Sequence, residues 1–141
     1  MAELRARYRG TARSVRDARN AVVEYARLCG FPSRVTVDIA LAVGEALANA
    51  VEHGNKDAGF IELACRFEGG TLIIEVQDGG TGFDVERVVR RQREPHSVRG
   101  FGITIMESLM DTVEYGDRGR FVRLHKRLGT EAHRAQEEQR A

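Results

Sequence analysis

The chain has 141 residues and a net charge of +1, so its bulk charge does not indicate a nucleic-acid or membrane-surface partner. This length predicts one domain with a real hydrophobic core. The first ten residues are charged and lack the apolar segment of a signal peptide, and no apolar run reaches the length of a membrane span. Cys29 and Cys65 have no metal-type spacing. We therefore expect a cytoplasmic protein with reduced thiols, which binds neither membranes nor nucleic acid directly.

The first part of the chain predicts one strand and two helices. Residues 3–9 alternate weakly between apolar and polar side chains, as an edge strand does. Thr11 or Ser14 can cap the next helix, and Gly30 is a typical residue for its end. A second helix is predicted over residues 32–54, with a proline in its permitted first turn.

The second helix has an unusual polar side. Glu45, Asn49 and Glu52 recur at helical spacing, with His53 at the edge, and no Lys or Arg follows the first turn. A bound metal ion could supply the missing positive charge, although most such stripes are only the solvated side of an amphipathic helix. Gly44 costs a helix interior up to about 1 kcal/mol relative to Ala, which indicates a close approach there.

The remainder of the chain predicts four strands and one helix. The strands are expected at residues 60–67, 72–76, 112–115 and 121–126. Gly69-Gly70 predicts a two-residue hairpin turn. A mobile basic connection is expected over residues 84–99, before a helix over 100–111. Strands joined by hairpins, with the helices grouped apart, predict an α+β two-layer sandwich over residues 1–128, followed by a polar tail over 129–141.

Two glycine-rich elements follow a strand and precede a helix. The turn that starts at Asp78 reads DGGTG, and its glycines can bring the backbone close to a ligand. Gly100 and Gly102 open a helix whose free N–H groups suit a phosphate, and Arg99 could add a charge-assisted contact. Each element alone is common in ordinary turns. Neither a Walker loop nor the dinucleotide-binding fingerprint occurs in the chain.

The combination is more specific than its parts. The segments EALANAVEHG, DGGTGFD and GFGITIMESLMD occur in that order. They resemble the N, G1 and G2 boxes of the ATPase superfamily that includes gyrase, histidine kinases and mismatch-repair ATPases. The small size and the wording of the boxes are similar to those of the anti-sigma factor serine-protein kinases of bacterial partner switching. The resemblance covers residues 5 to 127. It implies a Bergerat ATP-binding fold, with a mixed, mostly antiparallel sheet and three helices on one face.

The resemblance also implies roles for particular residues. Glu45 would be the catalytic general base, Asn49 would coordinate Mg²⁺, and Asp78 would accept a hydrogen bond from the adenine amino group of ATP. The arginine-rich segment 87–99 would form a lid. The other residues that would contact the nucleotide are His53, Gly80, Gly82, Arg99, Gly100, Gly102 and Thr104. Thr104 could equally be an ordinary helix residue.

The implied function is that of an ATP-dependent serine-protein kinase and anti-sigma factor. It would phosphorylate a STAS-domain antagonist and switch between that antagonist and a sigma factor or an equivalent target. Relatives are commonly homodimers, and residues 3–28 would supply the contact. Where the family often has a Gly-Thr pair that helps to hold adenine, this chain has Gly119-Arg120-Phe121. A nucleotide-gated protein-binding switch without kinase activity is therefore the alternative.

Overall fold

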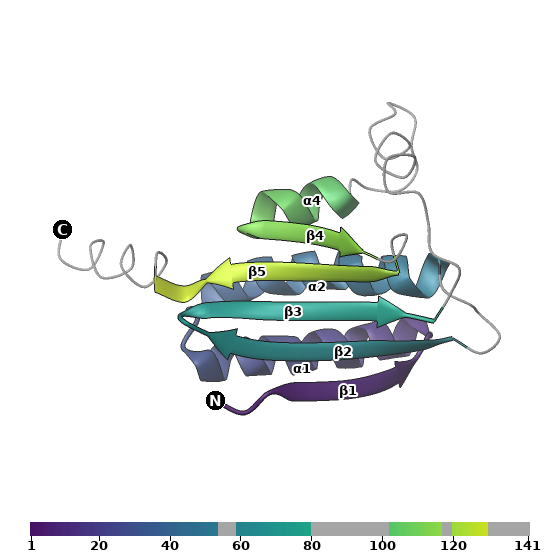
Figure 1. The fold of residues 1–141 in the computed structure, drawn as a ribbon, viewed down its shortest axis with the longest axis horizontal. Coiled ribbons are helices and arrows are strands. Elements are labelled where there is room, and N and C mark those ends of the chain that lie inside the picture. Colours follow the sequence, from purple (N-terminus) through teal and green to yellow (C-terminus); the bar gives the residue numbers. More distant parts are fainter. Residues whose placement is uncertain (54–58, 80–101, 117–119, 130–141) are drawn as a thin grey trace.

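The computed structural model describes residues 1–53, 59–79, 102–116 and 120–129 (Figure 1). The described strands are β1 (Leu4–Arg9), β2 (Phe60–Glu68), β3 (Thr71–Asp78), β4 (Thr112–Gly116) and β5 (Phe121–Arg127). The described helices are α1 (Ala12–Cys29), α2 (Ser33–His53) and α4 (Gly102–Leu109). None of these helices combines the length and the hydrophobicity of a membrane span.

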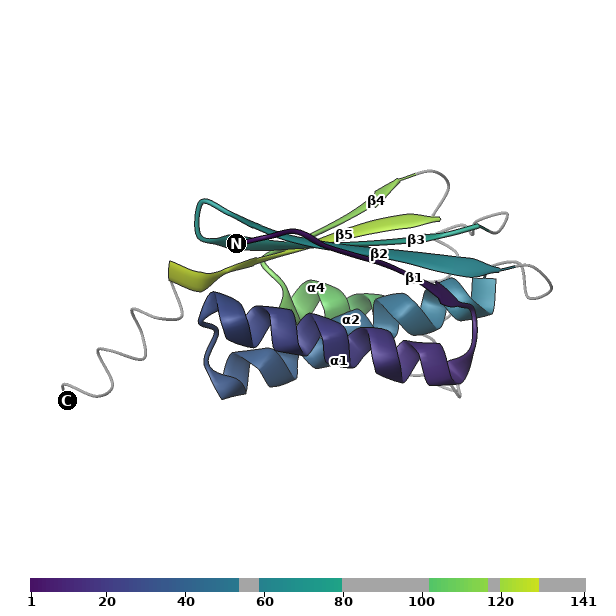
Figure 2. The same cartoon turned by 90° about the horizontal axis from the view of Figure 1, so that it is seen from below.

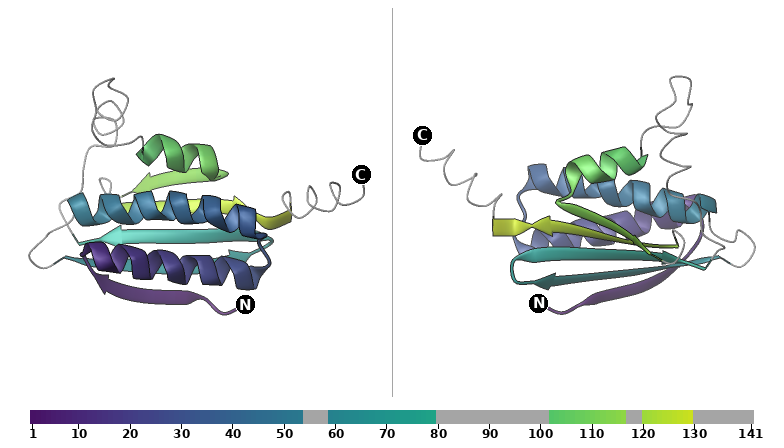
Figure 3. Two further views of the ribbon diagram at one scale, coloured as in Figure 1. Left: turned by 180° about the vertical axis from the view of Figure 1, so that it is seen from behind. Right: turned by 45° about the horizontal axis from the view of Figure 1, so that its top comes forward.

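The described strands form one sheet in the order β1-β2-β3-β5-β4, and all of its pairings are antiparallel. The described helices lie together on one face of this sheet (Figure 2). Seen from the helical side, α2 lies between α1 and α4 (Figure 3). This arrangement confirms the predicted α+β two-layer sandwich.

The predicted turns and helix ends follow from local chemistry. The Thr11 side chain accepts a hydrogen bond from the Ser14 backbone N–H at 3.2 Å and caps α1. Gly30 ends α1 with φ 106°, a left-handed conformation that suits glycine. Gly69 and Gly70 also have positive φ, 55° and 78°, as a two-residue turn between β2 and β3 requires.

The core lies between the two layers. Alternate residues of the central strands point toward the helices, and they meet the apolar side of α2. Among the largest fully buried side chains are Ile39 and Leu47 from α2, Leu63 from β2, Ile74 from β3 and Leu124 from β5. The helix α2 therefore packs against the sheet and against both other described helices.

The opposite face of the sheet carries a row of ion pairs. Glu75 on β3 pairs with Arg66 on β2 and lies 3.6 Å from Arg123 on β5. Arg123 in turn lies 3.3 Å from Glu114 on β4. Charges of opposite sign thus alternate across four strands. Partly exposed pairs of this kind contribute little stability individually, but they favour the observed strand register.

The end of α4 is anchored to β5. Lys126 is only 9% exposed, and its ammonium group donates a hydrogen bond of 2.7 Å to the carbonyl oxygen of Leu109, the last residue of α4. The Asp111 carboxylate accepts a hydrogen bond of 2.7 Å from the Arg127 backbone N–H. A cation at a helix C-terminus also interacts favourably with the helix dipole. The sheet therefore holds α4 at its C-terminal end.

We expect Lys126→Met to destabilise the protein, because it keeps the apolar stem of the side chain and removes the ammonium donor. Hydrogen bonds to charged groups contribute about 1.5–3 kcal/mol. The free energy of unfolding, measured by urea titration, should fall by an amount of that order. Arg127→Ala is the matched control, since the exposed Arg127 side chain is removed while its backbone hydrogen bond remains. Equal losses in both variants would contradict this role for Lys126.

The expectation of a close approach at Gly44 is not met in the described structure. A Cβ atom added there would lie 3.6 Å from the Cδ atom of Arg19 on α1, which is ordinary van der Waals contact. Arg19 also places a cation from α1 beside a stretch of α2 that has none of its own. Gly44 is therefore not required sterically at this contact.

Gly44→Ala should raise the free energy of unfolding by up to about 1 kcal/mol, since alanine loses less backbone entropy in a helix. Thermal or urea unfolding would measure the gain. Ala48→Gly, one turn later in the same helix, should produce a loss of similar size. A destabilised Gly44→Ala protein would mean that the contact with Arg19 needs the glycine.

Candidate functional site

Two residues that the sequence motifs single out, Asn49 and Asp78, line one small pocket. It lies between the helical layer and the helix-facing side of the sheet. The pocket is also lined by three larger side chains, which are Met106 of α4, Tyr115 of β4 and Arg120 before β5. The pocket thus draws on elements that are far apart in the sequence and adjacent in the fold.

Asn49 has the features of a ligand-binding amide. It lies in the C-terminal part of α2 and is only 7% exposed. Its side-chain nitrogen is fully buried and has no hydrogen-bond partner in the described part of the structure. A buried polar group without a partner is costly. The amide is therefore suited to a partner from outside the chain.

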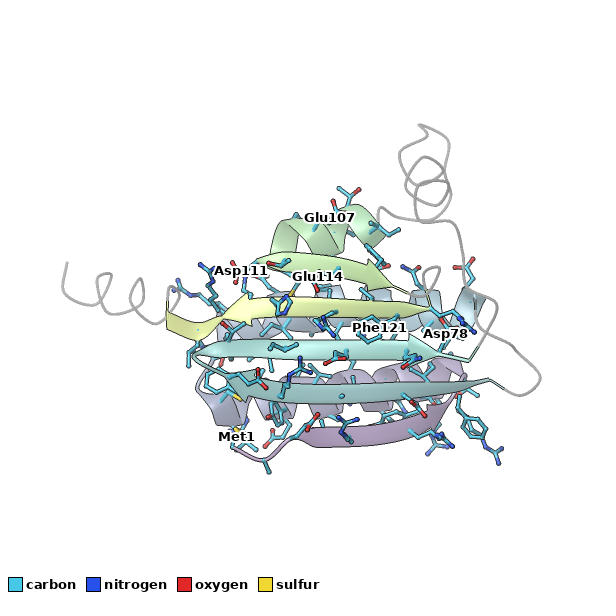
Figure 4. The ribbon with its side chains drawn as sticks, viewed as in Figure 1. Met1, Asp78, Glu107, Asp111, Glu114 and Phe121 are labelled. Carbon is cyan, nitrogen blue, oxygen red and sulfur yellow. The ribbon has the colours of Figure 1, made fainter. Side chains whose placement is uncertain are left out.

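Asp78 is placed by the alternation of β3. It is the last residue of that strand and faces the helices together with Val76, so its side chain is only 6% exposed. Its backbone N–H donates a hydrogen bond of 2.9 Å to the carbonyl oxygen of Arg120. Figure 4 shows Asp78 at the same end of the sheet as Phe121, the first residue of β5. A carboxylate in this position can accept hydrogen bonds from an amino group.

Tyr115 is a pocket residue that the motifs did not identify. Its hydroxyl is fully buried and has no partner within the described ranges. Burial, and to a smaller extent the negative charge of Glu107, raises the pKa of Tyr115 above its ordinary value. The phenol therefore stays protonated near neutral pH and can donate a hydrogen bond. Its signal in the sequence is only strand alternation, which places Val113 and Tyr115 on one face of β4.

Glu45 and Thr104 are close in sequence to residues of this pocket, but they are not among the residues that line it. Glu45 is half-buried on α2, one helical turn before Asn49. Thr104 is half-buried in the first turn of α4, and its hydroxyl is another fully buried group without a partner in the described structure. The structure thus brings together Asn49 and Asp78, with Glu45 next to Asn49 on the same helix.

Several other predicted site residues lie at the limits of the described ranges or outside them. Gly102 is the first residue of α4 and His53 the last of α2, but the His53 side chain is not described. The remaining predicted contacts lie outside the described residues, as do the lid over residues 87–99 and all but the first residue of the tail over 129–141. Those contacts are Gly80, Gly82, Arg99 and Gly100.

The donor set fits a magnesium ion held mainly by a nucleotide. In the described ranges, no group of three or more His, Cys, Asp or Glu side chains could hold a metal by itself. Mg²⁺ commonly takes only one or two protein ligands and completes its shell with phosphate oxygens and water. The buried amide of Asn49 meets that requirement, because its oxygen can coordinate a cation.

A larger hollow of about 360 Å³ lies on the face of the sheet away from the helices. Its polar lining includes Arg5 and Arg7 from β1, Glu62 from β2 and Glu75 from β3. Arg7 and Glu62 form an ion pair there at 2.7 Å. In the described ranges, none of the predicted nucleotide-binding residues lines this hollow, so size alone does not identify the functional pocket.

Comparison with known proteins agrees with the motifs. The chain is 30% identical over 122 residues to an anti-sigma F factor of Thermoanaerobacter sp. (strain X514), covering 81% of this chain and 85% of the relative. It is 34% identical over 101 residues to the serine-protein kinase RsbW of Listeria monocytogenes serotype 4a (strain HCC23), covering 64% of each chain.

A solved structure of the RsbU and RsbW domains of a Mycobacterium tuberculosis protein has the same fold. It superposes with a TM-score of 0.66 at 24% identity, over 91% of this chain and 33% of the solved one. This chain therefore spans about a third of that larger protein. The family model described as the histidine kinase-like ATPase domain matches residues 8–126, which include both buried pocket residues. With most of its length matched, the chain belongs to the histidine kinase-like ATPase domain family.

Proposed function

We propose that this chain is an ATP-dependent serine-protein kinase and anti-sigma-type regulator. It phosphorylates a STAS-domain anti-sigma antagonist and switches between that antagonist and a sigma factor or an equivalent target. The observation that carries the proposal is the shared pocket of Asn49 and Asp78, two buried polar residues from different layers. The names of the relatives, an anti-sigma F factor and a serine-protein kinase, support the same function.

In this proposal each residue has a distinct task. The Asp78 carboxylate accepts a hydrogen bond from the adenine amino group, and the Asn49 amide oxygen binds Mg²⁺. Bound Mg²⁺ would neutralise phosphate charge and align the transferred group, which is most of what phosphoryl transfer requires. Glu45 takes the proton from the serine hydroxyl of the antagonist, as a general base does.

The remaining contacts are assigned by motif. Gly80 and Gly82 would let the backbone pass close to the nucleotide, while Gly100 and Gly102 would hold the phosphates at the start of α4. His53, Arg99 and Thr104 would line the site. The ATPase domain would comprise residues 1–128, and residues 129–141 would form its polar tail.

We further propose that the protein acts in the cytoplasm, where sigma factors work, and forms a homodimer through residues 3–28. In the described structure this range comprises β1 at one edge of the sheet and most of α1. An edge strand and an adjacent amphipathic helix offer a surface that a second copy can use.

A nucleotide-gated protein-binding switch without kinase activity is the second candidate. Two observations favour it: Glu45 is not among the residues that line the pocket, and Arg120 is. In that case ATP or ADP would only select which partner is held. Partner exchange driven by a non-hydrolysable ATP analogue, with no phosphoserine on the antagonist by mass spectrometry, would favour the switch over the kinase.

Asn49→Ala should abolish Mg²⁺-dependent nucleotide binding, because it removes the metal-binding amide oxygen. Isothermal titration with ATP, in the presence of Mg²⁺ and of EDTA, measures the effect. Asn20→Ala, at an exposed position on α1, is the matched control and should leave affinity unchanged. If Asn49→Ala binds Mg-ATP as tightly as the parent chain, the metal assignment is wrong.

Glu45→Gln should reduce phosphoryl transfer by about 10²–10⁴-fold, the range that general base catalysis contributes. The assay uses Mg-ATP and a cognate STAS-domain antagonist, with phosphoserine followed over time. Glu52→Gln, the same change on the exposed part of α2, is the control and should retain the parent rate. If Glu45→Gln and the parent transfer phosphate at equal rates, Glu45 is not the base. The assignment of the nucleotide-binding residues would stand in that case.

A further inference from the structure

We propose that Tyr115 is a specificity-determining residue of the nucleotide pocket, whose hydroxyl hydrogen-bonds the base of ATP through one water held beside Asn49. The inference rests on the proposed function, because it assumes that this pocket receives a nucleotide. It adds a residue that lies in none of the three sequence boxes, on a strand that follows them in the chain.

The first step is the coincidence of unpaired polar groups. Tyr115 and Asn49 line the same pocket. The hydroxyl of Tyr115 and the side-chain nitrogen of Asn49 are both fully buried without a partner in the described structure. Buried polar groups are nearly always hydrogen-bonded, to protein or to ordered water. Two such groups on opposite layers of one pocket therefore indicate a shared external partner.

The size of the pocket indicates what that partner is. Between the lining atoms there is about 10 Å³ of room for the centre of a water molecule. This is close to the room that a single water requires and far too little for a purine ring. The water would lie among Tyr115, Asn49 and Asp78, which supply the two to four polar neighbours that buried waters have. The base would lie at the mouth of the pocket and contact this water.

The hydrogen-bonding pattern suits adenine. The Asp78 carboxylate is an acceptor and faces the same pocket as the Tyr115 phenol, which stays protonated and can donate. Adenine presents an amino donor with a ring-nitrogen acceptor on either side of it, N1 and N7. The Asp78 carboxylate on β3 would accept from the amino group directly, and the Tyr115 hydroxyl on β4 would reach the adjacent ring nitrogen through the water. The phenol thus supplies a hydroxyl contact, which neither Arg120 nor Phe121 can provide.

Tyr115→Phe tests the role of the hydroxyl alone, because it retains the ring and its packing. We expect the affinity for Mg-ATP, measured by isothermal titration, to fall about tenfold, the loss that one hydrogen bond produces. Without nucleotide, the midpoint of thermal unfolding should stay the same or rise, since a buried hydroxyl without a protein partner is removed. Thr112→Val, which removes an exposed hydroxyl from the same strand, is the control and should change nucleotide affinity by less than about twofold.

Nucleotide analogues locate the contact. The parent chain should bind either 1-deaza-ATP or 7-deaza-ATP more weakly than ATP, and Tyr115→Phe should bind that analogue and ATP equally. Loss of the difference in the variant would support the inference. The inference would be overturned if the parent and Tyr115→Phe bound ATP with equal affinity. It would also be overturned if the variant kept the parent's difference in affinity between ATP and each of the two analogues. If the parent chain fails to bind Mg-ATP at all, the proposed function itself is overturned, which separates the two failures.

Discussion

The packing of α2 against the middle of the sheet is the contact on which the rest of the structure depends. Ile39, Val43 and Leu47 are fully buried on this helix, and they meet side chains from β2, β3 and β5. The helices α1 and α4 pack on its two sides, so α2 is in contact with the sheet and with both of these helices. The one buried amide that it carries, on Asn49, is therefore held in a defined position at the end of the core. A site built on such an element is more exact than one built on a loop.

Much of the fold could be predicted because it is encoded locally. The hydroxyl of Thr11, the left-handed Gly30 and the Gly69-Gly70 turn each act within a few residues, and the structure has each of them where the sequence indicates. Asn49 and Asp78 are both buried and line one pocket. Their separate motifs did not reveal by themselves that the two side chains would share a pocket, because that depends on how β3 lies across α2.

What could not be predicted depends on tertiary contacts. Nothing near Lys126 in the chain indicates that its ammonium group would reach the end of α4. Gly44 indicated a close approach, whereas its neighbour is the side chain of Arg19 from another helix, at ordinary van der Waals distance. Tyr115 looked like an ordinary strand residue, and only the pairing of β4 with β5 brings it to the pocket. Each of these residues acquires its role from an element that is remote in sequence.

The edge position of β1 has a consequence for the order in which the fold forms. Pairing of β2 with β3 requires the closure of only a two-residue turn. Pairing of β1 with β2 closes a much longer loop, since the contact between Arg7 and Glu62 joins residues 55 positions apart. Closing the longer loop costs more chain entropy, and α1 and α2 must first fold within it. We therefore expect β1 to dock late in folding and to open early under native conditions. The amide hydrogens of Leu4–Arg9 would then exchange faster than those of β3, in the middle of the sheet.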